Sequence, residues 1–364
     1  MYTVLPAVKE YQWAEIDYKK NICHKFVNNY TPVAELWYGT HPDGPAYIQE
    51  TSEFIEDLIR PYQPSSFFKL LGVGKPLSIQ IHPDETNAKR LHIQNPDVYR
   101  DPFAKPEMAI VLSENAFAFC GIRPIRDIAR DILSSYSDLF DTDMIHRWKL
   151  EDDPLLIRDS FISVYEMSIT KYEILTHRLT VKHQTFRWLN KLYPSDRGCA
   201  IAVLFLNFLT LRKFDAIRIP PNEIHCYLLG NFFECMSISD NVIRAGLTNK
   251  FIDYTSFFSL ANFRECDLAD IVLAPIPVDG VRTYEFNPLP LIRITDDITS
   301  LKIPTKCGDA NFLFLIKLSD GECIVNNRHR LTDNKVVLID LEQTDEKDFI
   351  ELHGVQLSCI LIAL

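Results

Sequence analysis

A block of helical spacing interrupts a chain that otherwise consists of strand-like runs. Between about 125 and 195, apolar residues recur at helical spacing with few turn residues, as in IRDIARDILSSYSDLF. Before this block KPLSIQIH alternates apolar and polar positions, and after about 276 runs such as NFLFLIKL and KVVLIDL alternate with turns such as SDGE. Short strands separated by regular turns are typical of an antiparallel sandwich or jelly roll. We therefore predict a mainly β protein with an inserted α-helical domain.

The chain has 364 residues, which is too long for one compact core, and we expect two or three domains. The most apolar run, AIAVLFLNFLTL at 200–211, is too short to span a bilayer, and we expect it to form one or two buried strands. The changes in pattern divide the chain into the first part of a β domain, a helical insertion, the second part of the β domain and a C-terminal jelly roll, at 1–124, 125–198, 199–275 and 276–364.

Charge and cysteine content limit the partners and the compartment. The net charge of -11 argues against a broad nucleic-acid surface, although a local group of Lys and Arg could still bind an anionic substrate. Nine scattered cysteines without a close CxxC pair fit reduced thiols, and the N-terminus lacks the regions of a signal peptide. We expect a cytoplasmic protein with no nucleic-acid or membrane partner, and a monomer, since no feature favours a dimer.

Two polar residues on one predicted strand are candidate metal ligands. Side chains two apart on a strand share a face, so Gln80 and His82 in PLSIQIHPDE point the same way, with Ser78 beside them. Glu107 opens a later strand, and His225 lies beyond the helical block. This mixed nitrogen and oxygen set suits zinc and could also suit iron or manganese.

Spacing alone leaves a simpler interpretation open. A Gln-x-His pair is usually an exposed glutamine and a hydrogen-bonded histidine on a wet strand face. The other histidines have no such neighbours and are expected to be surface or core residues: His24, His41, His92, His146, His177, His183, His329 and His353.

A second dense stretch, HCYLLGNFFECMSISDNVIRAGLTNK at 225–250, carries several charges between short apolar runs. It could be a hairpin with solvated charges on one face. Alternatively, Arg244 and Lys250 could bind an anion, because a guanidinium offers a planar fork and an ammonium a point charge.

Taken together, these stretches resemble type I mannose-6-phosphate isomerase, also called phosphomannose isomerase. The resemblance is carried by AELWYGTHPDGPA, KPLSIQIHPD, CGIRP, NEIHCYL and SDNVIRAGLT, and it weakens after about 255. It implies a cupin-like jelly-roll catalytic domain, an inserted helical domain and a C-terminal jelly roll. It also implies an enzyme of carbohydrate metabolism, on the route to GDP-mannose.

The resemblance assigns roles to individual residues. One zinc ion per chain would be held by Gln80, His82, Glu107 and His225. Arg244 would be catalytic, and the substrate would be bound by the following group: Lys105, Lys250, Ser78, Tyr227, Trp13 and Asp240. The implied reaction interconverts mannose 6-phosphate and fructose 6-phosphate, with a proton leaving C2 and returning at C1 through a cis-enediolate. Zinc and Arg244 would stabilise the charge of this intermediate, and the sequence does not identify the general base.

The chain departs from the family pattern next to Lys105. The family reads roughly Y-x-D-x-N-H-K-P-E, whereas YRDPFAKPE has Phe103 and Ala104 in place of Asn and His. Alanine cannot transfer a proton. Two hypotheses therefore remain: an active zinc isomerase, or a catalytically weakened or inactive relative that binds metal and sugar phosphate. A non-haem iron oxygenase is a third hypothesis from the two His and one carboxylate alone, but Gln80 and the basic residues nearby argue against it.

Overall fold

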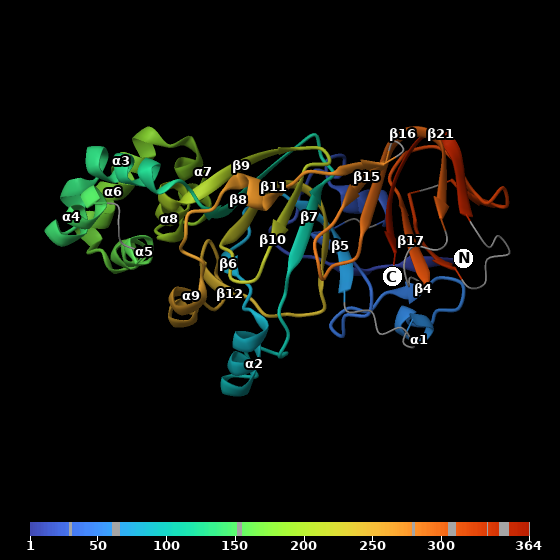
Figure 1. The fold of residues 1–364 in the computed structure, drawn as a ribbon, viewed down its shortest axis with the longest axis horizontal. Coiled ribbons are helices and arrows are strands. Elements are labelled where there is room, and N and C mark those ends of the chain that lie inside the picture. Colours follow the sequence, from blue (N-terminus) through green and yellow to red (C-terminus); the bar gives the residue numbers. More distant parts are fainter. Residues whose placement is uncertain are drawn as a thin grey trace.

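The protein is elongated, with helices at one end and two curled sheets in the middle and at the other end (Figure 1). The computed structural model describes residues 1–28, 31–59, 66–150, 155–278, 281–304, 311–332, 334–341 and 349–363. Among these described residues, all strand pairings within the two sheets are antiparallel, and strands make up a larger part of the fold than helices. The prediction of a mainly β protein with inserted helices is confirmed.

In the described part of the chain, the central sheet has eleven strands and carries the candidate ligands. Its strands are β2 (Ala7–Lys9), β3 (Glu35–Tyr38), β5 (Ser66–Val73), β6 (Ile79–Ile81), β7 (Glu107–Val111), β8 (Asn115–Ile122), β9 (Leu206–Arg212), β10 (Ala216–Ile219), β11 (His225–Ser237), β12 (Ile243–Gly246) and β13 (Val272–Leu273). The main path runs β13-β10-β7-β11-β5-β3-β2, while β6 and β8 also pair with β11.

Strand β11 joins the two halves of this sheet. Its first residues pair with β8, and from Gly230 onward it pairs with β5. The change follows a bulge between Tyr227 and Leu229. Gly230 has φ 124°, a value that side chains disfavour, and a Cβ there would lie 2.6 Å from the Cβ of Ala116. Because of this bend, His225 at the start of β11 lies in a different part of the sheet from the residues at the end of β11.

The second sheet has ten strands among the described residues and includes the strand Tyr2–Leu5 near the start of the chain. Its strands are β1 (Tyr2–Leu5), β4 (Tyr47–Ile48), β14 (Ile276–Val278), β15 (Val281–Tyr284), β16 (Ile292–Pro304), β17 (Phe312–Lys317), β18 (Cys323–Val325), β19 (His329–Leu331), β20 (Val336–Asp340) and β21 (Phe349–Ala363). Because β1 pairs with β20, the first residues of the chain pack with its last third. The division into four segments stays a prediction.

The helical region lies between β8 and β9 in sequence and forms one end of the molecule (Figure 1). It consists of α3 (Ile125–Ser135), the short turn η3 (Ser137–Leu139), α4 (Thr142–Leu150), α5 (Leu156–Glu166), α6 (Ile169–Lys182), α7 (Gln184–Leu192) and α8 (Gly198–Phe205). Its apolar faces share a core that includes Trp148, Phe161 and Leu189 and continues into β6 and β12. The helical region is therefore packed against the strands that carry Gln80 and Arg244.

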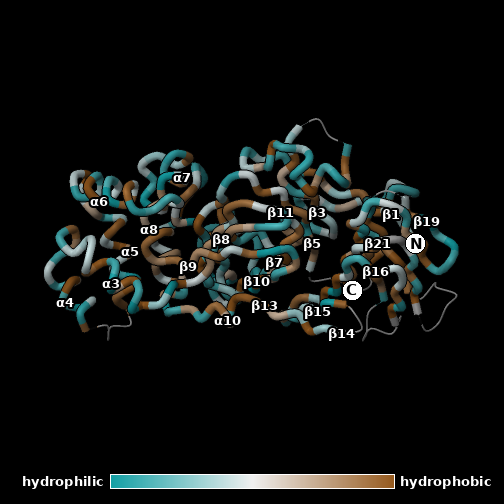
Figure 2. Tube along the Cα trace, turned by 90° about the horizontal axis from the view of Figure 1, so that it is seen from above, coloured by the Kyte–Doolittle hydropathy of each residue, from teal (hydrophilic) through white to brown (hydrophobic). Residues whose placement is uncertain are grey.

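The expectation that 200–211 forms one or two strands was wrong for its first half. Helix α8 covers Gly198–Phe205, and β9 begins directly at Leu206. All residues of α8 except Val203 are buried, so the run has no polar face whose period could distinguish a helix from a strand. Figure 2 shows the hydrophobic segment of α8 and β9 at the junction between the helices and the central sheet.

Short helices complete the fold: η1 (Ile22–Lys25), α1 (Ile55–Ile59), α2 (Glu85–Gln94), α9 (Tyr254–Leu260) and α10 (Leu268–Ile271). The Asp84 side chain caps α2, because it accepts a 2.9 Å hydrogen bond from Asn87 N at the start of the helix. Among the described residues, no helix has the length and apolar character needed to cross a bilayer.

Candidate metal centre

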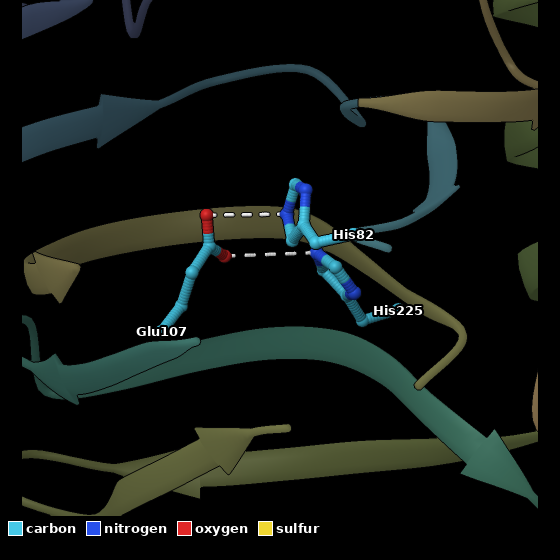
Figure 3. A group of neighbouring side chains, drawn as sticks. All are labelled: His82, Glu107 and His225. Carbon is cyan, nitrogen blue, oxygen red and sulfur yellow. Dashed lines mark ion pairs between the residues drawn. The ribbon is translucent and has the colours of Figure 1, made fainter. Parts of the chain in front are cut away.

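Three buried side chains from three strands or strand ends converge on one point (Figure 3). His82, Glu107 and His225 are each 1% exposed, and one ligand atom from each lies within 4.8 Å of the others. His82 Nε2 lies 3.2 Å from Glu107 Oε1, and His225 Nε2 lies 3.7 Å from Glu107 Oε2. Among the described residues, no other group of three His, Cys, Asp or Glu converges in this way.

Strand register brings this group together. Gln80 of β6 is paired with His225 of β11 on one side and with Arg244 of β12 on the other. His82 lies two residues after Gln80, so the two share a face as predicted. Glu107 opens β7, which pairs with the far half of β11 and closes the group from the other side.

Backbone carbonyls fix the tautomer of both histidines. His82 Nδ1 lies 2.7 Å from Asn241 O, and His225 Nδ1 lies 3.0 Å from Glu223 O. A carbonyl only accepts, so each Nδ1 carries the proton and donates it. In the neutral ring, Nε2 then presents a lone pair towards Glu107, which is the arrangement found in metal-ligating histidines.

The electrostatics keep the three groups deprotonated. Burial, with His82 adding to it, lowers the pKa of His225 to about 4, and burial together with Lys105 lowers the pKa of His82. Burial alone would raise the pKa of Glu107, but Lys105 and the two histidines outweigh it, and the pKa lies well below its usual range. At neutral pH the site therefore consists of two neutral imidazoles and one carboxylate.

A cation fits this set of atoms. His82 Nε2 and Glu107 Oε2 are buried without a hydrogen-bond donor, so lone pairs face one another across the site. Buried acceptors in this arrangement are satisfied by a divalent ion, and two imidazoles with one carboxylate are a set that suits zinc.

Gln80 lies beside the three ligands, and its amide nitrogen is 3.2 Å from His225 Nε2. Its Oε1 accepts a 2.8 Å hydrogen bond from Ser78 Oγ. Rotation of the amide by half a turn would direct Oε1 to the centre and let the Ser78 hydroxyl accept from the amide instead. The position of Gln80 is compatible with a fourth ligand, and this role stays a prediction.

The three basic residues expected at the site lie in two places. Lys105 is buried, and its Nζ lies 3.0 Å from Glu107 Oε1. Arg244 and Lys250 form a second group on the β12 side: burial lowers the pKa of both, and Arg244 adds to the lowering at Lys250. Lys250 Nζ lies 5.4 Å from the centre of the Tyr11 ring. In the part of the chain that the structure describes, neither Arg244 nor Lys250 pairs with a carboxylate, so two neighbouring cations are left for an anion.

The remaining predicted pocket residues surround this centre. Asp240 Oδ1 lies 3.3 Å from Nε2 of the buried His41, and although burial opposes it, this contact lowers the pKa of Asp240 to about 2. The Tyr227 ring is 6.2 Å from the ring of His225. Trp13 stacks on Tyr11 and packs against the apolar cluster that contains Tyr227.

Three buried charged residues near the site were not predicted. Lys69 Nζ lies 3.5 Å from Glu35 Oε2 and 3.6 Å from Glu234 Oε2, and these three residues, here called the Lys69 cluster, are nearly inaccessible. Burial and the Glu107 charge raise the pKa of Glu234 to about 7. The signal that could have found them is a charge inside an apolar strand, as in SFFKLLGV.

The two residues that depart from the family pattern lie at the edge of the site. Phe103 is 56% exposed, and its carbonyl accepts from Asn241 Nδ2 at 3.0 Å. Ala104 directly precedes the buried Lys105, whose Nζ contacts Glu107. Neither residue offers a group that titrates.

Comparisons with known proteins identify the family that the chain resembles. The family model of the phosphomannose isomerase type I catalytic domain matches residues 1–125. The chain is 30% identical to human mannose-6-phosphate isomerase over 317 residues, which are 74% of each chain. It is 28% identical to the Schizosaccharomyces pombe enzyme over 319 residues, 76% of this chain and 77% of the relative. A probable mannose-6-phosphate isomerase of Echinococcus multilocularis is 33% identical over 309 residues, 71% of this chain and 70% of the relative.

Solved structures share the fold over the whole chain. A mannose 6-phosphate isomerase bound with zinc and yttrium superposes with a TM-score of 0.85 at 22% identity, covering 100% of this chain and 99% of its own. The Salmonella typhimurium enzyme bound to fructose 6-phosphate and zinc has a TM-score of 0.84 at 22% identity and the same coverage. The expected cupin-like jelly-roll architecture is thereby confirmed, and the chain belongs to the mannose-6-phosphate isomerase family.

Proposed function

We propose that the protein is a zinc-dependent aldose–ketose isomerase that interconverts mannose 6-phosphate and fructose 6-phosphate. The observation that carries the proposal is the combination of two sites on neighbouring strands. Gln80 separates His225 of the buried ligand group from Arg244 of the cationic group in the strand register. A metal-binding group next to an anion-binding group suits a substrate with reacting oxygens at one end and a phosphate at the other.

Each part of the site has a definite task in this reaction. His82, Glu107 and His225, with Gln80 as the predicted fourth ligand, would hold a zinc ion that would supply Lewis acidity towards the reacting oxygens of the substrate. Arg244, one strand from the ligands, is placed to stabilise the negative charge that develops on these oxygens. Lys250 binds the phosphate as a point charge, and Lys105 holds Glu107 ionised and in place.

The burial of the metal ligands also favours this reaction. His82, Glu107 and His225 are each 1% exposed, so bulk water has little access to these side chains. An enediolate formed in such a site is stabilised by fixed charges and dipoles that need no reorganisation.

The proposal is tested by a coupled assay of mannose 6-phosphate turnover on zinc-replete protein, with Arg244→Ala as the matched variant. We expect turnover in the wild type and a loss of at least a hundredfold in kcat for Arg244→Ala, with zinc content unchanged. The absence of turnover in a zinc-replete wild type would refute the proposal.

Ala104 favours one alternative, a relative that binds zinc and sugar phosphate with weak or no catalysis. It rests on the missing titratable group beside Lys105. Fructose 6-phosphate binding without turnover, measured by calorimetry, would support this alternative. The monomeric state and the cytoplasmic location stay predictions.

A further inference from the structure

The turn that carries Lys250 is held by the helical region. Strand β12 pairs with β6 only as far as Gly246. The strand pairing therefore fixes Arg244 but not the residues after Gly246. Leu247 is buried and has φ 53°, a left-handed conformation that is unfavourable for leucine and persists only where surrounding contacts impose it. Something outside the strand must therefore hold the segment from Leu247 to Lys250.

Asp196, in the turn between α7 and α8, provides this contact. Its Oδ2 accepts from Leu247 N at 2.7 Å, while its Oδ1 accepts from Gly198 N, also at 2.7 Å. Burial raises the pKa of Asp196, and the backbone donors of Gly198, Leu247 and Thr248 oppose this rise. The carboxylate thus joins the first turn of α8 to the end of β12 through charge-assisted hydrogen bonds.

The backbones are in close contact at the same place. A Cβ on Gly246 would lie 2.8 Å from Gly198 Cα, so two glycines allow α8 to touch the end of β12. From α5, the hydroxyl of Tyr165 donates to the carbonyl of Ala245. Thr248 and Asn249 of the turn, together with Asp196 and Tyr165, line a cavity of about 760 Å³.

We propose that Asp196 is a positioning residue for phosphate binding: by holding Leu247, it places Lys250 for the phosphate of the substrate. This inference rests on the proposed function of the same site. It also assigns a role to the helical region, which supplies no candidate ligand or substrate contact but restrains a turn that does.

The test is Asp196→Asn, which keeps the shape but presents an amide N–H₂ to one of the two backbone N–H groups. We expect KM for mannose 6-phosphate to rise about tenfold, the effect of roughly one charge-assisted hydrogen bond. We expect kcat to change less than twofold, because the ladder with β6 still holds Arg244. Zinc content should be unchanged.

Asp159→Asn is the matched control. Asp159 lies in α5 of the same helical region, and its carboxylate pairs with Arg147 at 2.7 Å and with Arg158 at 3.2 Å rather than with β12. Its KM should equal that of the wild type. In a Lys250→Ala background, adding Asp196→Asn should produce no further rise in KM, since the residue acts through Lys250. Tyr165→Phe, which removes one hydroxyl, serves as a milder variant that retains the fold and should raise KM about threefold.

Calorimetric titration with inorganic phosphate gives a readout that needs no turnover, and its Kd should rise in parallel with KM. A KM and phosphate Kd that stay at wild-type values in both Asp196→Asn and Tyr165→Phe would overturn the inference, as would a parallel loss of kcat and zinc. If the wild type binds phosphate in this way without turnover, the proposed function fails and the positioning role stands.

Discussion

Replacing Lys69 by methionine should destabilise the protein by about 3–5 kcal/mol, because it removes the only cation of the Lys69 cluster. The side chains of Lys69, Glu35 and Glu234 are 9%, 9% and 5% exposed, and the two ion pairs measure 3.5 and 3.6 Å. At an effective dielectric constant of about 20, each contact corresponds to roughly 5 kcal/mol of attraction, most of which offsets the cost of burying the three charges. Methionine fills the volume of the lysine stem, so the loss measures the uncompensated carboxylates and not a cavity.

The destabilisation should be larger at pH 8 than at pH 6. Glu234 already has its pKa raised to about 7, compared with 4.5 in the unfolded chain, mainly by burial and by Glu107, and against the opposing effect of Lys69. A raised folded pKa contributes stability that is fully present below 4.5 and is lost as the pH rises through the folded pKa. Without the Lys69 ammonium, the pKa of Glu234 rises further, so the variant loses more stability above neutral pH.

The assay is urea-induced unfolding of metal-free wild type and Lys69→Met at both pH values. The triple variant Lys69→Met, Glu35→Gln, Glu234→Gln serves as the control and should recover most of the loss, because no charge remains buried without a partner. A loss below about 1 kcal/mol for Lys69→Met, equal at the two pH values, would refute the reasoning.

Three further predictions concern the metal and substrate groups. His82→Ala should purify with less than about a tenth of the wild-type zinc content while keeping its circular dichroism spectrum, because one of the converging Nε2 atoms is removed; full zinc content would contradict the site. Lys250→Ala should raise the KM for mannose 6-phosphate with little effect on zinc content, whereas an unchanged KM in steady-state kinetics would remove it from the phosphate site. Ala104→His should raise kcat by tenfold or more if the missing group limits proton transfer, and an unchanged kcat would show that another group performs this step.

Local pattern predicted much of the fold. Alternation in KPLSIQIH placed β6, because this pattern depends only on neighbouring residues. The first half of 200–211 was assigned as strand, because a run that is apolar on every side has no period to read. The pairing of β1 with β20 joins the two ends of the chain and leaves no local signal.

The candidate site was predicted only in part for the same reason. Gln80 and His82 could be paired by spacing, whereas His225 lies 145 residues from Gln80 and joins it only through the register of β6 with β11. Lys69 and Asp196 carry no motif of their own, since their roles arise from partners in other segments: Glu35 and Glu234 for the first, Leu247 for the second.

The central claim is that this chain performs isomerisation with one zinc ion held by His82, Glu107 and His225. The most direct measurement is the turnover of mannose 6-phosphate by chelator-treated protein during stepwise addition of zinc. The account predicts that activity is absent at the start, rises with each addition and reaches its plateau at about one zinc per chain. Turnover that survives complete metal removal, or a zinc-saturated protein without turnover, would contradict it.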